Sequence, residues 1–307
     1  GKNLTVGTNN LPVRVIAEDG SEKVYTIKVK RKSVPTLLTS EIMKNTIITA
    51  NPTLTTSSNN TSDKSGLYKS TLTNTGEPTY YFRGNVENNY VSFAGYTWRI
   101  VRVNEDGTIR IVMQDGINNN EYIAFNSNDN NYTYMYYSNS NAKTQLNSWY
   151  QTNIGSKSDL ANKVVSGNYY CEQAKAKYDS SYTSGNASMT VYSRYTPNFK
   201  CTTDGNGKGQ VSANVGLLSY DEVVYAGGYY NQNNSNYYLY NSAIYWWTMS
   251  PSGFSFSNSH VWRVFTTGNI NSDTVDTPLA LRPVLILKAD TLATGDGTSS
   301  DPFIIVP

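Results

Sequence analysis

The sequence predicts an α+β fold in which an antiparallel sheet dominates and helices are few and short. Tyrosine supplies 26 of the 307 residues and most of the aromatic set, and aromatic residues favour strands. Apolar and polar residues alternate with a period of two in several segments, which is the pattern of strands with one buried face. Helical periodicity is restricted to two short stretches.

The first segment with a strand pattern is an N-terminal hairpin. Residues 13–31 contain two extended runs joined by an Asp-Gly dipeptide, which favours a turn. In the second run Tyr25, Ile27 and Val29 share one face, as in a half-buried strand. A hairpin alone is marginal in water, and a β-sandwich needs about 100 residues. We therefore interpret residues 1–33 as the C-terminal part of a truncated β-sandwich.

A composition change separates this hairpin from a larger domain. Residues 34–65 are rich in Thr, Ser and Asn and are predicted to be an extended linker. Residues 66–307 form the second predicted domain, which begins with at least three strand candidates. Within it, Ile109, Ile111 and Met113 alternate with their neighbours, and the preceding Asn-Glu-Asp-Gly run predicts a hairpin.

Two stretches of the second domain have helical signals. In "NAKTQLNSWYQTNI", Leu146, Trp149 and Tyr150 fall on one face of a helix. Ser219 and Glu222 have the spacing of a capping box, in front of an apolar run that ends at a glycine.

An aromatic segment at residues 229–253 contains two different patterns. "AIYWWTMSP" is a short apolar run, so Ile244, Trp246 or Trp247, and Met249 are predicted to form a core strand that ends at Ser-Pro. "YYNQNNSNYYLY" has no period, and the polar residues at its centre predict a loop.

This loop has two competing interpretations. Asn, Tyr, Lys and Ile have AT-rich codons, so a low-GC genome explains the composition without any function. Tyrosine and tryptophan also give large rigid contact areas, and Asn and Ser give adaptable hydrogen bonds, as in antibody paratopes. The sequence leaves open whether the tyrosines are displayed or folded inward.

Two cysteines, Cys171 and Cys201, lie in a region rich in Gly, Asn, Ser and Tyr. The chain has one histidine, His260, and no CxxC motif, so the ligands for a zinc site are too few. We expect a disulfide, which closes a loop of about thirty residues and contributes roughly 3 kcal/mol. Disulfides persist outside the cytoplasm, so we expect an extracellular protein.

The charge pattern argues against two classes of partner. The formal net charge is +2, from 25 basic and 23 acidic residues, and there is no long basic run. Nucleic-acid binding needs a concentrated positive charge, so we do not expect it. No stretch of 18 or more apolar residues occurs, so we expect no membrane insertion of this fragment.

Two family resemblances add to these patterns. "VIAEDGSEKVYTIKVKRK" resembles the last strands of cadherin-like β-sandwich repeats of Gram-positive surface proteins. From Gly66 to Pro307, motifs such as "LNSWY", "GLLSYDEVVYAGG" and "YWWTMSPSGF" resemble a domain of unknown function in Bacillota extracellular proteins. Within it, "WWTMSP" followed by "LRPVL" is similar to C-type-lectin-like domains related to formylglycine-generating enzymes.

The resemblances imply a fold but no activity. They imply a compact C-type-lectin-like α+β domain whose N- and C-terminal strands pair, with long loops that present a variable binding face. The EPN, QPD and WND motifs of calcium-dependent lectins are absent, and the cysteines lack the context of the formylglycine-generating enzymes. Neither chemistry is therefore expected here.

Candidate catalytic groups are weak, and we predict no catalytic residue. His260 has no GxSxG elbow to accompany it. Asp221 and Glu222 are adjacent, so on a helix they point about 100° apart, unlike a glycosidase pair. Asp296 and Asp301 lie in "GDGTSSDP", whose Gly-Asp-Gly favours a turn, with a structural calcium ion as the lesser alternative. We predict no metal and no cofactor.

The function expected from the sequence is an extracellular surface module for adhesion or ligand binding, without catalysis. The expected partner is a glycan or a host or microbial protein. One alternative is a structural spacer in a surface stalk, and another is a carbohydrate-active enzyme with two converging carboxylates. The residues predicted to bind are Tyr229, Tyr230, Tyr237, Tyr238, Tyr240, His260 and Trp262.

Overall fold

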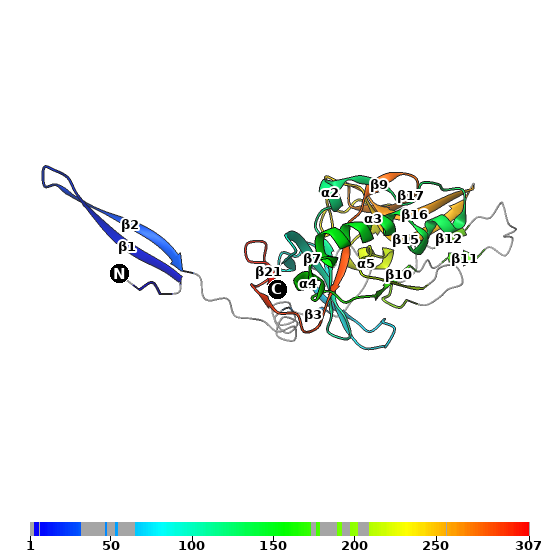
Figure 1. The fold of residues 1–307 in the computed structure, drawn as a ribbon, viewed down its shortest axis with the longest axis horizontal. Helices are drawn as coiled ribbons and strands as arrows, with labels where there is room; N and C mark the ends of the chain where they lie inside the picture. Colours follow the sequence, from blue (N-terminus) through cyan, green and yellow to red (C-terminus); the bar gives the residue numbers. More distant parts are fainter. Residues whose placement is uncertain are drawn as a thin grey trace. The chain divides into compact units, whose positions relative to one another are not determined.

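Two units make up the chain in the computed structural model, residues 1–37 and 38–307 (Figure 1). The structure describes residues 3–5, 7–31, 47, 53–54, 65–172, 176–178, 189–191, 197–201, 209–255 and 257–306. Most of the predicted linker at 34–65 lies outside these residues. Its described residues include Ile47, which is buried, and a short strand, β3 (Thr53–Leu54), that pairs with β4 (Gly66–Ser70).

The first unit is the predicted hairpin. Strands β1 (Gly7–Ile16) and β2 (Glu22–Arg31) pair antiparallel along their whole length. The expectation that one face of the second strand is buried is wrong within this unit, because Tyr25 and Ile27 are 50% and 51% exposed. A two-stranded hairpin has no second layer of its own against which this face can pack.

Most strands at the two ends of the second unit join one sheet. Its order is β20-β21-β6-β7-β5-β4-β3, with β8 beside β7 and β19 beside β8. The C-terminal strands thus pair with early strands: β21 with β6 in parallel and β19 with β8 in antiparallel orientation. Besides β3 and β4, the strands are β5 (Thr79–Arg83), β6 (Tyr90–Phe93), β7 (Tyr96–Val103), β8 (Ile109–Met113), β19 (Val284–Leu287), β20 (Ala293–Thr294) and β21 (Phe303–Ile305).

The β7–β8 hairpin was predicted, but its burial pattern was not. The turn places Gly107 at φ +82°, and the Gly107 N–H donates to the carbonyl oxygen of Asn104 at 3.0 Å. Every residue of β8 is buried, including Arg110 at 2% exposure. Other elements of the unit pack on both sides of this strand, so the two faces on which its side chains alternate are both buried.

A second sheet has the order β11-β12-β15-β16-β17-β14, with β18 beside β15 and β9 beside β18. A separate pair is β10 (Asn168–Cys171) with β13 (Gln210–Ala213). The strands of the second sheet are β9 (Tyr122–Ala124), β11 (Ala176–Tyr178), β12 (Met189–Val191), β14 (Tyr229–Tyr230), β15 (Trp246–Ser255), β16 (Asn258–Val264), β17 (Asn269–Thr274) and β18 (Pro278–Ala280).

The predicted core strand is the first half of β15. Ile244 precedes it, and Trp246, Trp247 and Met249 lie within it, all at most 2% exposed. The expectation that Ser-Pro ends this strand is wrong. β15 continues through Pro251 to its end at Ser255, with register shifts on both sides of the proline. Irregularities of this kind accommodate a residue that lacks an N–H.

Helices are few and short among the described residues, as predicted. In α3, Ser140 caps the first turn, and Leu146, Trp149 and Tyr150 are buried. In α5, Ser219 and Glu222 form the predicted capping box. The helical segments are α2 (Ile117–Asn120), η1 (Tyr132–Met135), η2 (Tyr137–Asn139), α3 (Asn141–Tyr150), η3 (Gln151–Gly155), α4 (Ser158–Ala161) and α5 (Tyr220–Ala226).

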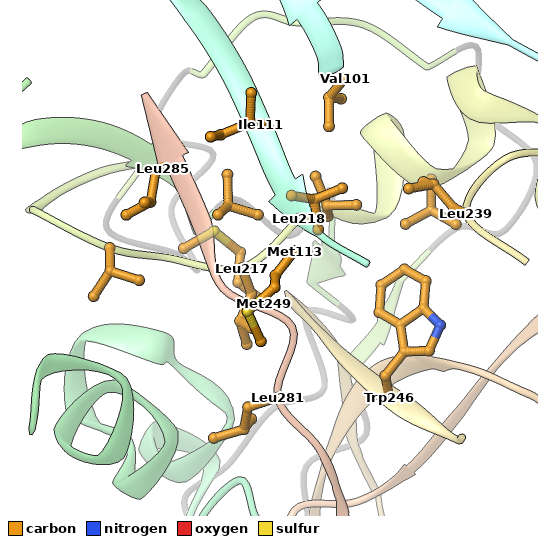
Figure 2. Close-up of a cluster of buried hydrophobic side chains, with 14 of the residues drawn as sticks. Val101, Ile111, Met113, Leu217, Leu218, Leu239, Trp246, Met249, Leu281 and Leu285 are labelled. Carbon is orange, nitrogen blue, oxygen red and sulfur yellow. The ribbon is translucent and has the colours of Figure 1, made fainter. Parts of the chain in front are cut away.

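The core of the second unit joins its two large sheets. Ile111 and Leu285 come from the first sheet and Trp246 and Met249 from the second, and all four are at most 1% exposed. Figure 2 shows these side chains together with those of the loops around them. Burying one such side chain contributes roughly 1.5–3 kcal/mol, so this cluster holds the two sheets together.

A buried cation also ties the sheets together. Arg282 lies between β18 and β19 and donates from Nε to the carbonyl oxygen of Met113 (3.0 Å) and from Nη1 to that of Leu239 (2.8 Å). Its guanidinium carbon lies 4.7 Å from the ring centroid of Trp246. Burial lowers the pKa of Arg282 to about 10. Removal of this side chain would leave two carbonyl groups without their donor.

Candidate functional site

Two hollows lie at opposite ends of the β7–β8 hairpin. The first, the disulfide pocket, is lined by residues that include Arg102, Arg110, Tyr170, Cys171, Cys201 and Glu222. The second, the asparagine groove, is lined by residues that include Tyr96, Asp115, Asn118, Asn119, Asn120 and Trp149. Strand geometry separates the two by roughly 15–20 Å.

The disulfide pocket is small, and its lining includes Glu222 with the groups that bind its carboxylate. Its cavity volume is about 80 Å³, far below the roughly 300–1,000 Å³ of ligand pockets. Arg110 donates from Nη2 to Oε2 of Glu222 at 3.1 Å, and its Nε lies 2.5 Å from Oε1. Nε of Arg102 lies 3.5 Å from the same Oε1. The backbone N–H of Ser219 also donates to Oε2, at 2.9 Å.

These contacts leave the Glu222 carboxylate little freedom for chemistry. Glu222 is 3% exposed, pairs with two arginines and takes part in the capping box of α5. Its neighbour Asp221 accepts from the N–H of Asn198 at 3.2 Å. Both carboxylates of the adjacent acidic pair are therefore used by structural contacts. A buried network of this kind is costly to break, because each partner left behind is an uncompensated charge.

The predicted disulfide is confirmed. Cys171 ends β10, and its bond to Cys201 spans 30 residues, with the Cα atoms 5.4 Å apart. The N–H of Cys201 donates to Oδ1 of Asn74 at 2.7 Å, so both ends of the bond are attached to the second unit. The disulfide thus forms part of the pocket wall.

The asparagine groove is larger and more open. Its cavity volume is about 560 Å³, which is within the range of small-molecule sites. Three segments build it: the β6–β7 turn, the chain from the end of β8 through α2, and the end of α3 with η3. Asp115 is the charged residue among those that line it, and its Oδ1 accepts a weak hydrogen bond from Asn241 at 3.5 Å.

Three consecutive asparagines give the groove its rim. Asn118, Asn119 and Asn120 have φ values of 50°, 59° and 65°, in the left-handed region that asparagine tolerates better than most residues. Asn120 accepts from the N–H of Gly116 at 2.6 Å, and Asn118 donates to Glu121 at 2.9 Å. Asn119 is exposed and carries two amide donors and an acceptor into solvent.

Aromatic side chains also line the groove and form its aromatic wall. The ring centroids of Tyr96 and Trp149 lie 5.3 Å apart, at an interplanar angle of 56°. The Tyr96 hydroxyl donates to Oδ1 of Asn153 at 2.8 Å, and Nδ2 of Asn153 donates to the carbonyl oxygen of Trp149 at 2.8 Å. Tyr96 is half-buried and lines the groove, and the buried Trp149 packs against its ring.

The structure places the seven predicted binding residues at different depths. Tyr237 and Tyr238 are 2% and 3% exposed, with the Tyr237 hydroxyl donating to the carbonyl oxygen of Gly268 at 2.9 Å. Tyr229 is buried, and its hydroxyl accepts from Arg83 at 2.8 Å. Their rings are core side chains, although their segment has the composition of a loop. Their binding role, and that of the other four residues, stays a prediction.

Three of the seven residues come together on the second sheet. Trp262 and His260 lie two residues apart on β16 and share a face, and Tyr230 on β14 packs edge-on against Trp262 at 5.5 Å between centroids. Tyr230 is 40% exposed, Trp262 is 4% exposed and His260 is half-buried. The remaining residue, Tyr240, is half-buried close to Gly268.

The groove was missed at the sequence level, although one signal for it exists. A run of three asparagines directly after Gly116 and Ile117 is a sign of left-handed backbone, since asparagine adopts it at low cost. The aromatic wall gave no signal, because Trp149 matches a helix core position equally well. The three segments are far apart in the chain.

Among the residues described, no group of three or more His, Cys, Asp or Glu side chains is placed to hold a metal ion. Asp296 accepts from the N–H of Thr298 at 3.0 Å and from its hydroxyl at 2.8 Å, as in a polar turn. No helix in the described part of the chain is long and apolar enough to cross a bilayer.

One family model matches the chain. Its description is a domain of unknown function, DUF6273, and the match covers residues 111–289, which is more than half of the 307 residues. It begins within β8 and ends just after β19, so it contains the asparagine run, the disulfide and Arg282. No curated protein and no solved structure matches the chain. The chain therefore belongs to the DUF6273 family.

Proposed function

We propose that this chain is part of an extracellular surface protein and that its second unit binds a glycan in the asparagine groove without catalysis. The observation that carries the proposal is the groove itself. It combines a volume of about 560 Å³, exposed asparagine amides and a half-buried tyrosine in its lining. Amides match sugar hydroxyls, and aromatic faces match the apolar faces of sugar rings.

The location and the finer fold assignment belong to the same proposal. The disulfide supports an extracellular location, because such bonds persist in oxidising compartments. The pairing of β19 and β21 with early strands supports a C-type-lectin-like fold for the second unit. The hairpin β1–β2 is assigned to a cadherin-like repeat on its sequence motif.

An array of neutral, amino and acidic glycans tests the proposal, with Asn119→Gly as the key variant. Glycine accepts the φ of 59° at this position, so the change removes the amide and leaves the backbone in place. The wild type should bind a subset of the array, and the variant should lose most of that binding. The loss of one or two hydrogen bonds should lower the affinity by about 10-fold.

Asn231→Gly is the matched control. Asn231 is also exposed and left-handed, with a φ of 53°, but it lies at the end of β14, outside the residues that line the groove. This variant should bind as the wild type does. If the wild type binds no glycan, or if both variants lose the same amount of binding, the groove is not a glycan site.

A further inference from the structure

We propose that the asparagine groove continues into a row of aromatic side chains, and that groove and row together bind a linear, non-acidic oligosaccharide of several rings. The aromatic row consists of Tyr122, Tyr240, Tyr245 and Phe265. This inference rests on the proposed glycan binding and specifies its ligand.

Strand pairing joins the row to the groove. Gly116 lines the groove and packs against β18, where an added Cβ would lie 3.0 Å from the Cβ of Ala280. Ala280 pairs with Tyr122 on β9, and its N–H donates to the carbonyl oxygen of Tyr245 at 2.9 Å. Neighbouring strands are about 4.8 Å apart, so the backbones of Tyr122 and Tyr245 begin within about 10 Å of Gly116.

Short contacts and a shared turn bring the members of the row close together. The Tyr122 side chain is 43% exposed, and its hydroxyl accepts from the N–H of Tyr245 at 3.2 Å. The rings of Tyr245 and Phe265 lie 5.6 Å apart between centroids. The Tyr240 ring lies against Gly268, in the turn that Phe265 begins. Tyr245 thus contacts both Tyr122 and Phe265, Tyr240 lies at the turn that Phe265 begins, and all four side chains are at least partly exposed.

A neutralised cation supports this surface from one side. The guanidinium carbon of Arg263 lies 4.0 Å from the ring centroid of Phe265 and 5.5 Å from that of Tyr245. Arg263 is also paired with Asp273 at 3.0 Å. Its charge orients the rings without leaving a positive patch for an acidic ligand. At the groove end, the carboxylate of Asp115 likewise disfavours sugars with acidic groups.

The surface fits a chain of sugar rings better than a polypeptide strand. An extended peptide would add to the open edge of β9, but side chains and backbone of α3 occupy the end of that edge. Nδ2 of Asn141 donates to the carbonyl oxygen of Ala124 at 3.2 Å, and the N–H of Ala142 donates to that of Phe125 at 3.0 Å. Aromatic faces in a row instead match successive sugar rings.

A length series tests this inference. The probes are glucose and N-acetylglucosamine oligosaccharides from disaccharide to hexasaccharide, titrated against the wild type and Tyr122→Ala. Wild-type affinity should rise with chain length. Tyr122→Ala should lower affinity for the hexasaccharide by about three- to ten-fold, the loss of one aromatic contact, and leave the disaccharide unchanged. Asn119→Gly should weaken binding at every length.

Two further variants control the experiment. Tyr122→Phe keeps the ring and should keep the affinity. Tyr169→Ala removes a tyrosine that is 60% exposed beside the disulfide pocket, and it should have no effect. The extended site is wrong if affinity does not rise beyond the disaccharide, or if Tyr122→Ala does not change the affinity for the hexasaccharide. Either result leaves glycan binding by the groove in place. The absence of binding at every length rejects the proposed function as well.

Discussion

The disulfide pocket and the asparagine groove are both lined by polar groups, but those of the pocket are buried and paired, whereas several of those of the groove are exposed. In the pocket, Glu222 is buried, forms ion pairs with Arg102 and Arg110, and takes part in the capping box of α5. In the groove, Asp115 and Asn119 are exposed, around a volume about seven times larger (560 Å³ against 80 Å³). A cluster of charges that satisfy one another stabilises the fold, whereas exposed donors around an open volume are available to a ligand.

The largest expected effect comes from breaking the network of the pocket. Glu222→Gln should destabilise the second unit by about 3–5 kcal/mol, because Arg110 keeps its buried charge and loses its partner. Urea denaturation measures this change. Glu105→Gln is the control, since Glu105 lies 3.7 Å from Arg102 near the surface and should cost less than about 1 kcal/mol. Equal costs for the two variants would mean that the pocket is not a structural centre.

Removal of the disulfide should have the next largest effect. Cys171→Ser combined with Cys201→Ser should lower the free energy of unfolding by about 3 kcal/mol, because the open chain gains entropy in the unfolded state. Glycan binding by the folded fraction should not change, because the groove lies at the other end of the β7–β8 hairpin. If the double variant is fully folded without denaturant but no longer binds glycan, the disulfide pocket contributes to binding, and the contrast between pocket and groove is wrong.

Alkaline pH gives a smaller effect that also belongs to the pocket wall. Burial raises the pKa of Tyr170 above its usual value near 10, and its hydroxyl donates to the carbonyl oxygen of Val284 at 2.9 Å. Tyr170 ionises in the unfolded chain first, so its contribution is fully present below about pH 10 and is lost as pH rises towards the folded pKa. The loss is about 1.4 kcal/mol per pH unit.

Tyr170→Phe isolates this contribution from the other buried tyrosines. Burial also raises the pKa of Tyr137, Tyr237 and Tyr238, so the wild type should lose stability steeply above pH 10. The slope for Tyr170→Phe should be shallower by about 1.4 kcal/mol per pH unit. Identical slopes from urea denaturation at pH 10 to 11 would show that Tyr170 ionises in the folded protein.

Local signals in the sequence predicted local features of the fold well. The Asn-Glu-Asp-Gly turn, the capping box of Ser219 with Glu222, and the disulfide all follow from residues whose chemistry is short-ranged or unique in the chain. The burial of Tyr237 and Tyr238 could not be predicted. It depends on distant groups, since Tyr237 donates to the carbonyl of Gly268 and its segment has no period of its own.

The candidate site was harder to predict for the same reason. The groove brings together a turn at Tyr96, the run around Asn119 and the helix end at Trp149, and no local pattern connects these segments. Its rim also needs a backbone conformation that propensities assign to single residues, not to three in succession. What the sequence did contain was the residue type, because asparagine is the usual side chain for such positions.

The smallest expected effect tests that backbone directly and separates the rim's conformation from its chemistry. At a φ of 59°, Asn119→Gly should keep the stability within about 0.5 kcal/mol, whereas Asn119→Val should cost about 1–2 kcal/mol, because a branched Cβ clashes in the left-handed region. Thermal unfolding of the wild type and the two variants measures their stabilities, and the protein with valine at this position should be the least stable of the three. If valine is tolerated as well as glycine, the rim is not held left-handed, and the exposed amides lose the fixed geometry that distinguishes the groove from the pocket.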